Sequence, residues 1–333
     1  MYKRQGYDPI TKQQVGPHTG SARDWKSVDD LKEAYSKQQK FFVKPWLEAF
    51  NKVVSCHAYA LPTIAASCFV EGCIEQGKVL QQAGASHRIS TCAITSIADV
   101  VDSIAAIQEC VFNKKYLTMD ELMDALEKDF EGCEDIRQML INKAPKYGNN
   151  IEEVDDYGRW LVDLCNEDCV HFAEGRYGRF STVEATQSYN VVLGRLLGAT
   201  PNGRHAYADT ADNCSPSNGM DVNGPTACVS SVANLDHMVP QSGMLLNLRF
   251  DPVLTKGEKG LDILETVIRA YMTKRGEHIQ INVMDTETLL AAKENPKEYQ
   301  NIMVRVAGYS ARFVDLDPEV QDNIITRTSH NSL

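Results

Sequence analysis

Val304-Arg305-Val306-Ala307-Gly308-Tyr309-Ser310-Ala311-Arg312-Phe313 places a single glycine between two short apolar runs. Glycine has no Cβ, so its backbone can adopt a positive φ and can approach other atoms closely. One interpretation is therefore a tight turn between two buried strands, the usual role of a lone glycine in such a pattern. The other is chemical, because loss of hydrogen from the glycine Cα leaves a radical spread over the flanking amide nitrogen and carbonyl. A side chain would crowd that planar centre.

The residues around and after Gly308 favour the chemical interpretation. The string R-V-A-G-Y-S at 305–310, followed by Q-D-N-I-I-T-R-T at 321–328, resembles the C-terminal signature of the glycyl radical enzymes. This family includes pyruvate formate-lyase, B12-independent glycerol and diol dehydratases, choline trimethylamine-lyase, hydroxyproline dehydratase and benzylsuccinate synthase. The resemblance implies that Gly308 carries an organic radical installed by a radical S-adenosylmethionine activase, with no other bound cofactor.

Two further strings carry the same resemblance. G-A-T-P-N-G-R at 198–204 is a turn by its proline and Asn-Gly pair, and it also matches the family pattern G-A-T-P-x-G-R. The loop 214–227 resembles a second family string, although Asn213 stands where many relatives have glycine. Long loops rich in Gly, Pro and Ser are usually functional or disordered, so we expect a pocket-forming loop with Asp221 as a structural anchor.

The family motif of the catalytic cysteine, of the form G-C-x-E, has no convincing copy in this sequence. Cys73-Ile74-Glu75 has the C-x-E spacing, but similar strings occur in the family well after that motif, so a structural role is expected for Cys73. The polar stretch 8–20 resembles the family segment that follows the catalytic cysteine. We therefore expect the C-terminal part of a glycyl radical enzyme, either a fragment or one half of a split enzyme.

Two further residues are candidates for the site. In the family, the strand before G-A-T-P lines the substrate pocket, and dehydratases place a tyrosine near it. This makes Tyr189 the candidate substrate-binding residue, with a buried structural tyrosine as the alternative. His278 could be a base in the pocket, but a hydrogen-bonded core histidine is the more ordinary interpretation.

The periodicity of the chain predicts strands that alternate with helices, which indicates an α/β core. Residues 277–283 alternate as in a strand, 261–275 form an amphipathic pattern, and 91–110 read as one buried helix. The resemblance implies the second half of a ten-stranded α/β barrel with a C-terminal glycine loop. We expect residues 1–280 to belong to the barrel domain and 281–333 to form the glycine radical domain.

The composition limits the partners and the location. The chain of 333 residues has a formal net charge of −11, which argues against nucleic acid or an anionic membrane as the main partner. No run of eighteen apolar residues and no signal peptide is evident, so a cytoplasmic protein is expected. Ten scattered cysteines suggest reduced thiols, and Cys165 with Cys169 lacks further ligands at metal-site spacing, so no metal is expected.

The expected function is hydrogen abstraction through a thiyl radical, in a dehydratase or C–X lyase of a small polar substrate of the glycerol, diol, hydroxyproline or choline type. The expected partners are the activase, the small-molecule substrate and a second copy in a homodimer. A fumarate-adding enzyme and a formate C-acetyltransferase-like enzyme remain alternatives. Two other classes are also open: a non-catalytic radical-domain subunit, and a plain α/β protein in which Gly308 is only a turn.

Overall fold

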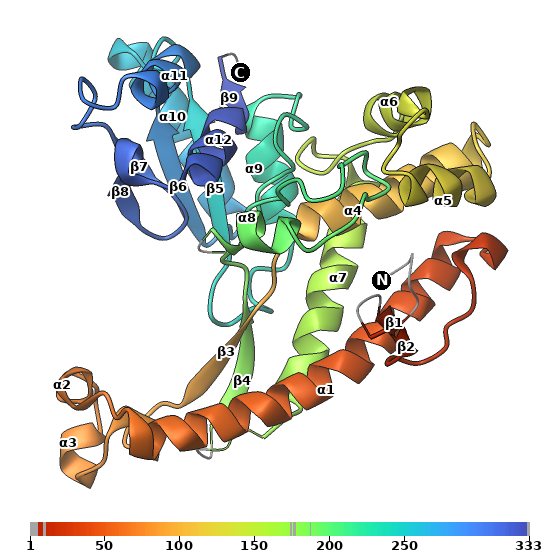
Figure 1. The fold of residues 1–333 in the computed structure, drawn as a ribbon. Helices are drawn as coiled ribbons and strands as arrows, with labels where there is room; N and C mark the ends of the chain where they lie inside the picture. The colour runs from red at the N-terminus through yellow and green to blue at the C-terminus, as the bar shows by residue number, and fades with distance from the viewer. Residues whose placement is uncertain (1–5, 9–10, 174, 176–177, 187, 332–333) are drawn as a thin grey trace.

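The fold is built on parallel strands. The computed structural model describes residues 6–8, 11–173, 175, 178–186 and 188–331 (Figure 1). Strand β3 (Ile89–Ala93) pairs in parallel with β4 (Arg179–Val183), and β5 (Leu245–Phe250) pairs in parallel with β6 (His278–Val283) and β9 (Ser329–His330). A parallel bridge between Glu184 and Met244 connects the two sheets. The parallel strands are joined by helical crossovers, as an α/β architecture requires.

Helices surround these strands. Helix α1 is the longest and runs along one side of the molecule, where it packs against α7 (Figure 1). The helices are α1 (Val28–Ala60), α2 (Ile64–Ser67), α3 (Cys73–Gln76), α4 (Ile97–Ala106), α5 (Met119–Glu127), α6 (Glu134–Lys143), α7 (Glu152–Val170), α8 (Tyr189–Gly194), α9 (Pro225–Ala233), α10 (Gly257–Thr273), α11 (Thr286–Glu294) and α12 (Pro318–Thr326). Two small antiparallel pairs complete the structure, β1 (Tyr7–Asp8) with β2 (Gln13–Gln14), and β7 (Met303–Arg305) with β8 (Ser310–Arg312).

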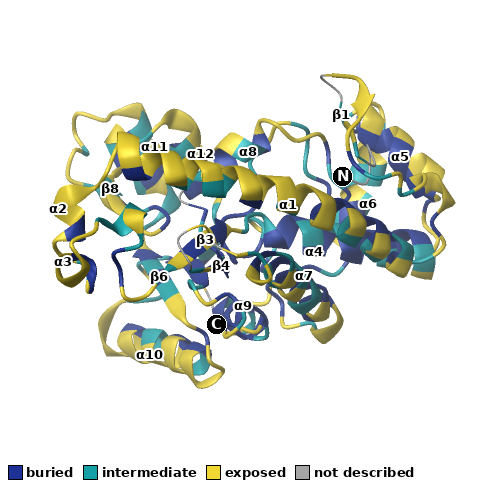
Figure 2. Cartoon of the chain, turned by 90° about the horizontal axis from the view of Figure 1, so that it is seen from below, coloured by how far each residue is buried: buried dark blue, intermediate teal, exposed yellow. Residues whose placement is uncertain are grey.

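Three hydrophobic clusters hold these elements together, and the smallest joins α1 and α7 to β3 and β4 through Leu47, Cys92, Cys169 and Phe180. The largest joins α4, α7 and α9 to β5 through their buried apolar side chains, whereas most residues of α10 are exposed, as Figure 2 shows. A smaller cluster joins α11, the β7–β8 hairpin and α12 through Leu289, Val304, Val306, Phe313 and Ile324. Because Val304 and Val306 are nearly fully buried, this second cluster fixes the base of the hairpin that carries Gly308. No helix in the described part of the chain combines the length and apolarity needed to span a bilayer.

The predicted buried helix over 91–110 is wrong at its N-terminal end. Ile89–Ala93 forms strand β3, Ser96 adopts a φ of +65°, and α4 begins only at Ile97. The helix then continues as a π-helix from Ile107 to Asn113. β-branched and small residues fit either structure over a short run, and the choice is made here by β4, a pairing partner about ninety residues away.

Asp102 of α4 illustrates a polar group inside the largest cluster. Its side chain is fully buried, and its carboxylate accepts hydrogen bonds from the Tyr147 amide at 2.8 Å and from the Ser217 hydroxyl at 2.9 Å. Burial raises the pKa of Asp102 to about 6, because desolvation outweighs the attraction of Lys146 and these two hydrogen bonds.

We expect the free energy of unfolding to fall as pH rises from about 4 to about 6. In that window the unfolded chain has lost the Asp102 proton while the folded chain retains it. Each rise of one pH unit therefore favours the unfolded state. The loss attributable to Asp102 is about 3 kcal/mol. Urea unfolding at several pH values measures this slope, and Asp102→Asn, which keeps an acceptor for Tyr147, should flatten it. An unchanged slope in the variant would contradict the assignment.

Candidate active site

Gly308 lies at the tip of the β7–β8 hairpin. Arg305 pairs with Ser310, and the Val306 amide donates to the Tyr309 carbonyl at 2.9 Å, so Ala307 and Gly308 are the two central residues. Gly308 has a φ of +85°, a conformation that residues with a side chain rarely adopt. A Cβ built on Gly308 would meet nothing within 4 Å, so backbone conformation, and not crowding, explains a glycine here on structural grounds. Gly308 is exposed in this chain.

Two polar side chains of β6 hold the hairpin from below. The Gly308 amide donates to Gln280 Oε1 at 3.2 Å. Asn282, two residues further on the same face, accepts from the Arg305 amide and donates to the Arg305 carbonyl, both at 2.8 Å. Gln280 and Asn282 are both buried, and their polar groups form hydrogen bonds with the hairpin. The main chain on both sides of the tip is therefore held by side chains of the sheet.

A second group of side chains converges on the Val306 carbonyl. Asn247 of β5 donates to this oxygen at 3.1 Å, and Arg327, just after α12, donates at 3.0 Å. Arg327 also forms a buried ion pair with Asp212 at 2.9 Å, and Asp212 accepts further hydrogen bonds from Asn247 and from Thr186. Four segments that are distant in sequence thus meet behind the hairpin.

Tyr189, the candidate substrate-binding residue, begins the short helix α8 and is 58% exposed. The alternative of a buried structural tyrosine does not describe this chain. The hydroxyl oxygen of its neighbour Ser188 lies 3.2 Å from the hydroxyl oxygen of Tyr309. Helix α8 therefore starts beside the hairpin. Sequence reasoning did not single out Ser188 or Tyr309, because a contact across 121 residues leaves no local signal. Substrate binding by Tyr189 stays a prediction.

A polar groove of about 450 Å³ runs between β6 and β7, beside the hairpin. His278, Gln280, Asn282, Arg305 and Ser310 line it. His278 is exposed at the start of β6, so the core-histidine interpretation is wrong here, and its Nε2 lies 3.3 Å from Gln280 Nε2. The groove offers hydrogen-bond donors and acceptors, but no acidic side chain among the described residues lines it.

The loop 214–227 is anchored to the C-terminal segment. Asp221 is buried, accepts a hydrogen bond from the Thr328 hydroxyl, and pairs with His330 at 3.2 Å. Cys228 lies close enough that ligand atoms of Asp221, Cys228 and His330 fall within 4.8 Å of one another. The Asp221 carboxylate is hydrogen-bonded to Thr328, whereas the buried His330 Nε2 lies near it without a hydrogen-bond partner among the described residues. These contacts fasten the loop to the segment that carries Arg327.

The cysteines named from sequence lie away from the hairpin. Cys73 is buried in α3, which lies with α2 well below β7 and β8 in Figure 1. Cys165 and Cys169 are both buried in α7, where the Cys165 thiol contacts the Gln39 side chain. Burial raises the pKa of Cys165, so this thiol is protonated and unreactive near neutral pH.

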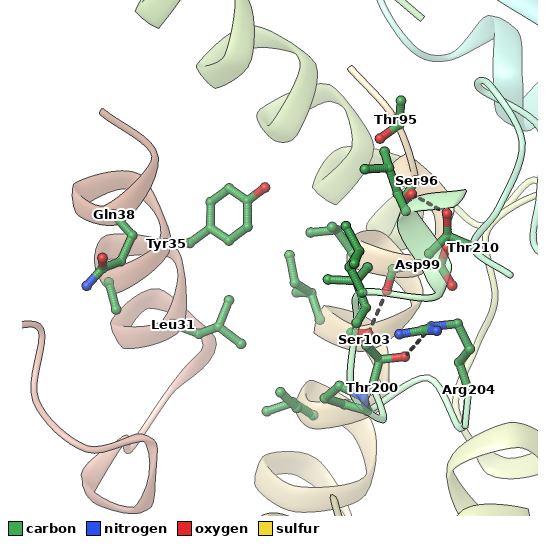
Figure 3. A pocket seen from close by; sticks show the side chains of 18 of the residues that line it. Leu31, Tyr35, Gln38, Thr95, Ser96, Asp99, Ser103, Thr200, Arg204 and Thr210 are labelled. Carbon is green, nitrogen blue, oxygen red and sulfur yellow. Dashed lines mark hydrogen bonds between the residues drawn. The ribbon is translucent and has the colours of Figure 1, made fainter. Parts of the chain in front are cut away.

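An apolar cavity of about 440 Å³ separates α1 from α4. Leu31 and Tyr35 of α1 face Ser103 and other α4 residues across it (Figure 3). Leu193 and Leu197 also line the cavity, and none of the hairpin residues does. Further along α1, Phe41, Phe42 and Trp46 are exposed. An apolar surface of this kind, extended along one helix, is typical of a face that another polypeptide covers.

The family models match both parts of the chain. The model described as pyruvate formate lyase-like matches residues 2–194, and the model described as glycine radical matches residues 210–314, which include Gly308. The chain belongs to the glycyl radical enzyme family. The expected fold, a part of the α/β barrel of this family, is confirmed by the structural neighbours.

Several glycyl radical enzymes similar to this chain are dehydratases or lyases. Trans-4-hydroxy-L-proline dehydratase of Clostridioides difficile is 38% identical over 97% of this chain and 41% of its own, and isethionate sulfite-lyase of Bilophila wadsworthia is 37% identical over 96% and 39%. Among solved structures, B12-independent glycerol dehydratase of Clostridium butyricum matches with a TM-score of 0.93 and 40% identity. Its match covers 99% of this chain and 42% of that enzyme. Hydroxyproline dehydratase of Clostridioides difficile matches with a TM-score of 0.94 and 37% identity, over 99% and 42%.

This glycyl radical enzyme chain therefore spans about two fifths of the length of the relatives that it matches. The matched regions are 2–194 and 210–314, and they leave the division into residues 1–280 and 281–333 a prediction. The hairpin, the groove and the residues that hold them all lie within the part of the chain that the relatives share.

Proposed function

We propose that Gly308 stores an organic radical and that this chain acts in a dehydratase or C–X lyase of a small polar substrate. The observation that supports this most directly is the hairpin. It presents Gly308 at its exposed tip, while buried side chains of the sheet bind its main chain at Arg305, Val306 and Gly308. A glycine held in this way can lose and regain a hydrogen atom without displacement of the surrounding chain.

In this proposal, a radical S-adenosylmethionine activating enzyme removes one hydrogen atom from the Gly308 Cα. The radical then takes a hydrogen atom from a cysteine thiol, which restores Gly308 and leaves a thiyl radical. The thiyl radical abstracts a hydrogen atom from substrate, a group such as water or an amine leaves, and the hydrogen atom returns. This chain's contribution is to hold the Gly308 amide in place, which the buried side chains beneath the hairpin support.

The polar groove supports a small polar substrate. His278, Gln280, Asn282 and Ser310 offer hydrogen bonds in a groove that Arg305 of the hairpin also lines, which suits a polyol, a hydroxy-amino acid or a similar molecule. The relatives named for hydroxyproline, isethionate and glycerol support the same class. A fumarate-adding enzyme or a formate C-acetyltransferase-like enzyme is a second candidate, but no described apolar pocket next to Gly308 favours the hydrocarbon partner of the former.

We also propose that the thiyl cysteine belongs to polypeptide that covers the apolar cavity between α1 and α4. The support is the shared length, since the relatives extend well beyond the two fifths that this chain matches, and the cavity with the exposed residues of α1 needs a cover. A cytoplasmic homodimer is proposed from the family resemblance. A non-catalytic radical-domain subunit is the alternative from another class.

The experiment is anaerobic activation followed by electron paramagnetic resonance. The chain is incubated with S-adenosylmethionine and a reduced activase, and a glycyl doublet is expected. The activated chain is then combined with the N-terminal portion of Clostridioides difficile hydroxyproline dehydratase and assayed with trans-4-hydroxy-L-proline, isethionate, glycerol and propane-1,2-diol. Turnover of one of these supports the enzyme, and a doublet without turnover of any supports the radical-domain subunit. Absence of a doublet contradicts the whole proposal.

A further inference from the structure

Gln280 is the side chain that bonds directly to Gly308. Gln280 Oε1 accepts a hydrogen bond from the Gly308 amide, with 3.2 Å between oxygen and nitrogen, and the residue is only 5% exposed. The other side chains that hold the hairpin bind Arg305 and Val306 instead. Among the described contacts, Gln280 alone therefore touches the peptide group that flanks the proposed radical centre.

The orientation of the Gln280 amide is set by His278. The two residues lie on the same face of β6, and the Gln280 nitrogen is 3.3 Å from His278 Nε2. When His278 is neutral and its Nε2 carries no hydrogen, that atom accepts from the Gln280 NH₂ group, so the Gln280 carbonyl is left to face Gly308. A flipped amide would place an NH₂ group against the Gly308 N–H, with two donors in contact.

A hydrogen bond at this N–H changes the stability of a radical on the adjacent carbon. The glycyl radical is stabilised by donation from the amide nitrogen lone pair and by withdrawal into the carbonyl on the other side. An acceptor on the N–H increases the electron density at nitrogen, which strengthens the donation and draws more unpaired spin onto that atom. The burial of the Gln280 side chain increases the effect, although Gly308 itself is exposed, because a hydrogen bond polarises its partners more strongly where the dielectric constant is low.

We propose that Gln280 is a positioning residue for the glycyl radical. It orients the Gly308 amide and increases the unpaired spin on its nitrogen, and His278 holds the Gln280 side chain in the required orientation. This inference rests on the proposed function, because it needs the radical on Gly308. It identifies a control on radical lifetime that lies on β6, outside the glycine loop itself.

The test compares four variants after anaerobic activation, two at Gln280, one at Asn282 and one at His278. Gln280→Met keeps the length of the side chain but removes the acceptor, and Gln280→Glu restores an acceptor. Asn282→Leu is the matched control, because Asn282 lies on the same face of β6 and binds the hairpin at Arg305 without contacting Gly308. The protein is prepared with ¹⁵N-glycine, and electron–nuclear double resonance measures the coupling to the Gly308 nitrogen. The half-life of the doublet is measured under argon.

Gln280→Met is expected to lower the nitrogen coupling and to shorten the half-life about fivefold, the factor that corresponds to one net hydrogen bond. Gln280→Glu should recover both quantities, and Asn282→Leu should leave the coupling unchanged even if the radical yield falls. His278→Leu is the second route to the same result, and should also lower the coupling, because the Gln280 side chain loses the contact that holds it against Gly308.

Two results would overturn the inference while leaving the radical assignment intact. One is a nitrogen coupling in Gln280→Met equal to that of the unaltered chain, and the other is a change in Asn282→Leu as large as that in Gln280→Met. Loss of the doublet in the unaltered chain is a different result, because it removes the proposed function and the inference together. If Gln280→Met does not fold, an unaltered coupling in His278→Leu is the outcome that overturns the proposal.

Discussion

Replacing Gly308 by alanine is expected to abolish the glycyl doublet while the chain remains folded. An alanyl radical at this position would lose the unhindered planar centre that the two flanking peptide groups require, and the activating enzyme would face a methyl group beside the remaining hydrogen. The structural cost is small, because a Cβ at Gly308 meets nothing within 4 Å and only the φ of +85° is unfavourable, by about 1–2 kcal/mol. Electron paramagnetic resonance after anaerobic activation measures the outcome.

Gly132→Ala provides the matched control. Gly132 has a φ of +71° and also has no atom within 4 Å of an added Cβ, so the two substitutions carry a similar conformational cost. Gly132 lies in the connection between α5 and α6, away from the hairpin. The control should lose a similar amount of stability and keep the doublet. A doublet that persists in Gly308→Ala would place the radical on another residue.

The largest expected loss of stability comes from Arg327→Met. Arg327 and Asp212 form an ion pair whose side chains are 10% and 4% exposed, and Arg327 also donates to the Val306 carbonyl. Removing the guanidinium leaves the Asp212 carboxylate buried without its counter-charge, which costs about 3–5 kcal/mol. Urea unfolding measures this cost, and the doublet should decay faster because the hairpin loses one of its anchors.

Arg312→Met tests whether the effect depends on burial. Arg312 pairs with Asp315 at 2.7 Å, but both side chains are about half exposed, at 52% and 53%. Solvent screens such a pair, and its loss should cost less than about 1 kcal/mol. Equal losses in the two variants would mean that the Arg327–Asp212 pair is not the element that holds the hairpin.

The local elements of this fold were largely predictable because their patterns are regular. The alternation over 277–283 gave strand β6, and the amphipathic pattern over 261–275 gave α10, each within a few residues. Thr118 and Glu121 form a reciprocal cap at the start of α5, as their spacing indicates. By contrast, the predicted helix over 91–110 wrongly includes Thr91–Ala93 of strand β3, because so short a run carries no periodicity that separates a buried strand from a helix.

Parts of the candidate site could likewise be predicted from the sequence, and other parts could not. The sequence by itself determined the family and pointed to Gly308 as the proposed radical residue, because the strings at 305–310 and 321–328 are long and specific. Only the tertiary structure decided what holds Gly308: Gln280 at its amide, Asn247 and Arg327 at the Val306 carbonyl, and Asp212 behind them. The physical reason is separation along the chain. These bonds join residues from 21 to more than 100 positions apart, so no local spacing encodes them, and they exist only once parallel strands bring their polar side chains beneath the hairpin.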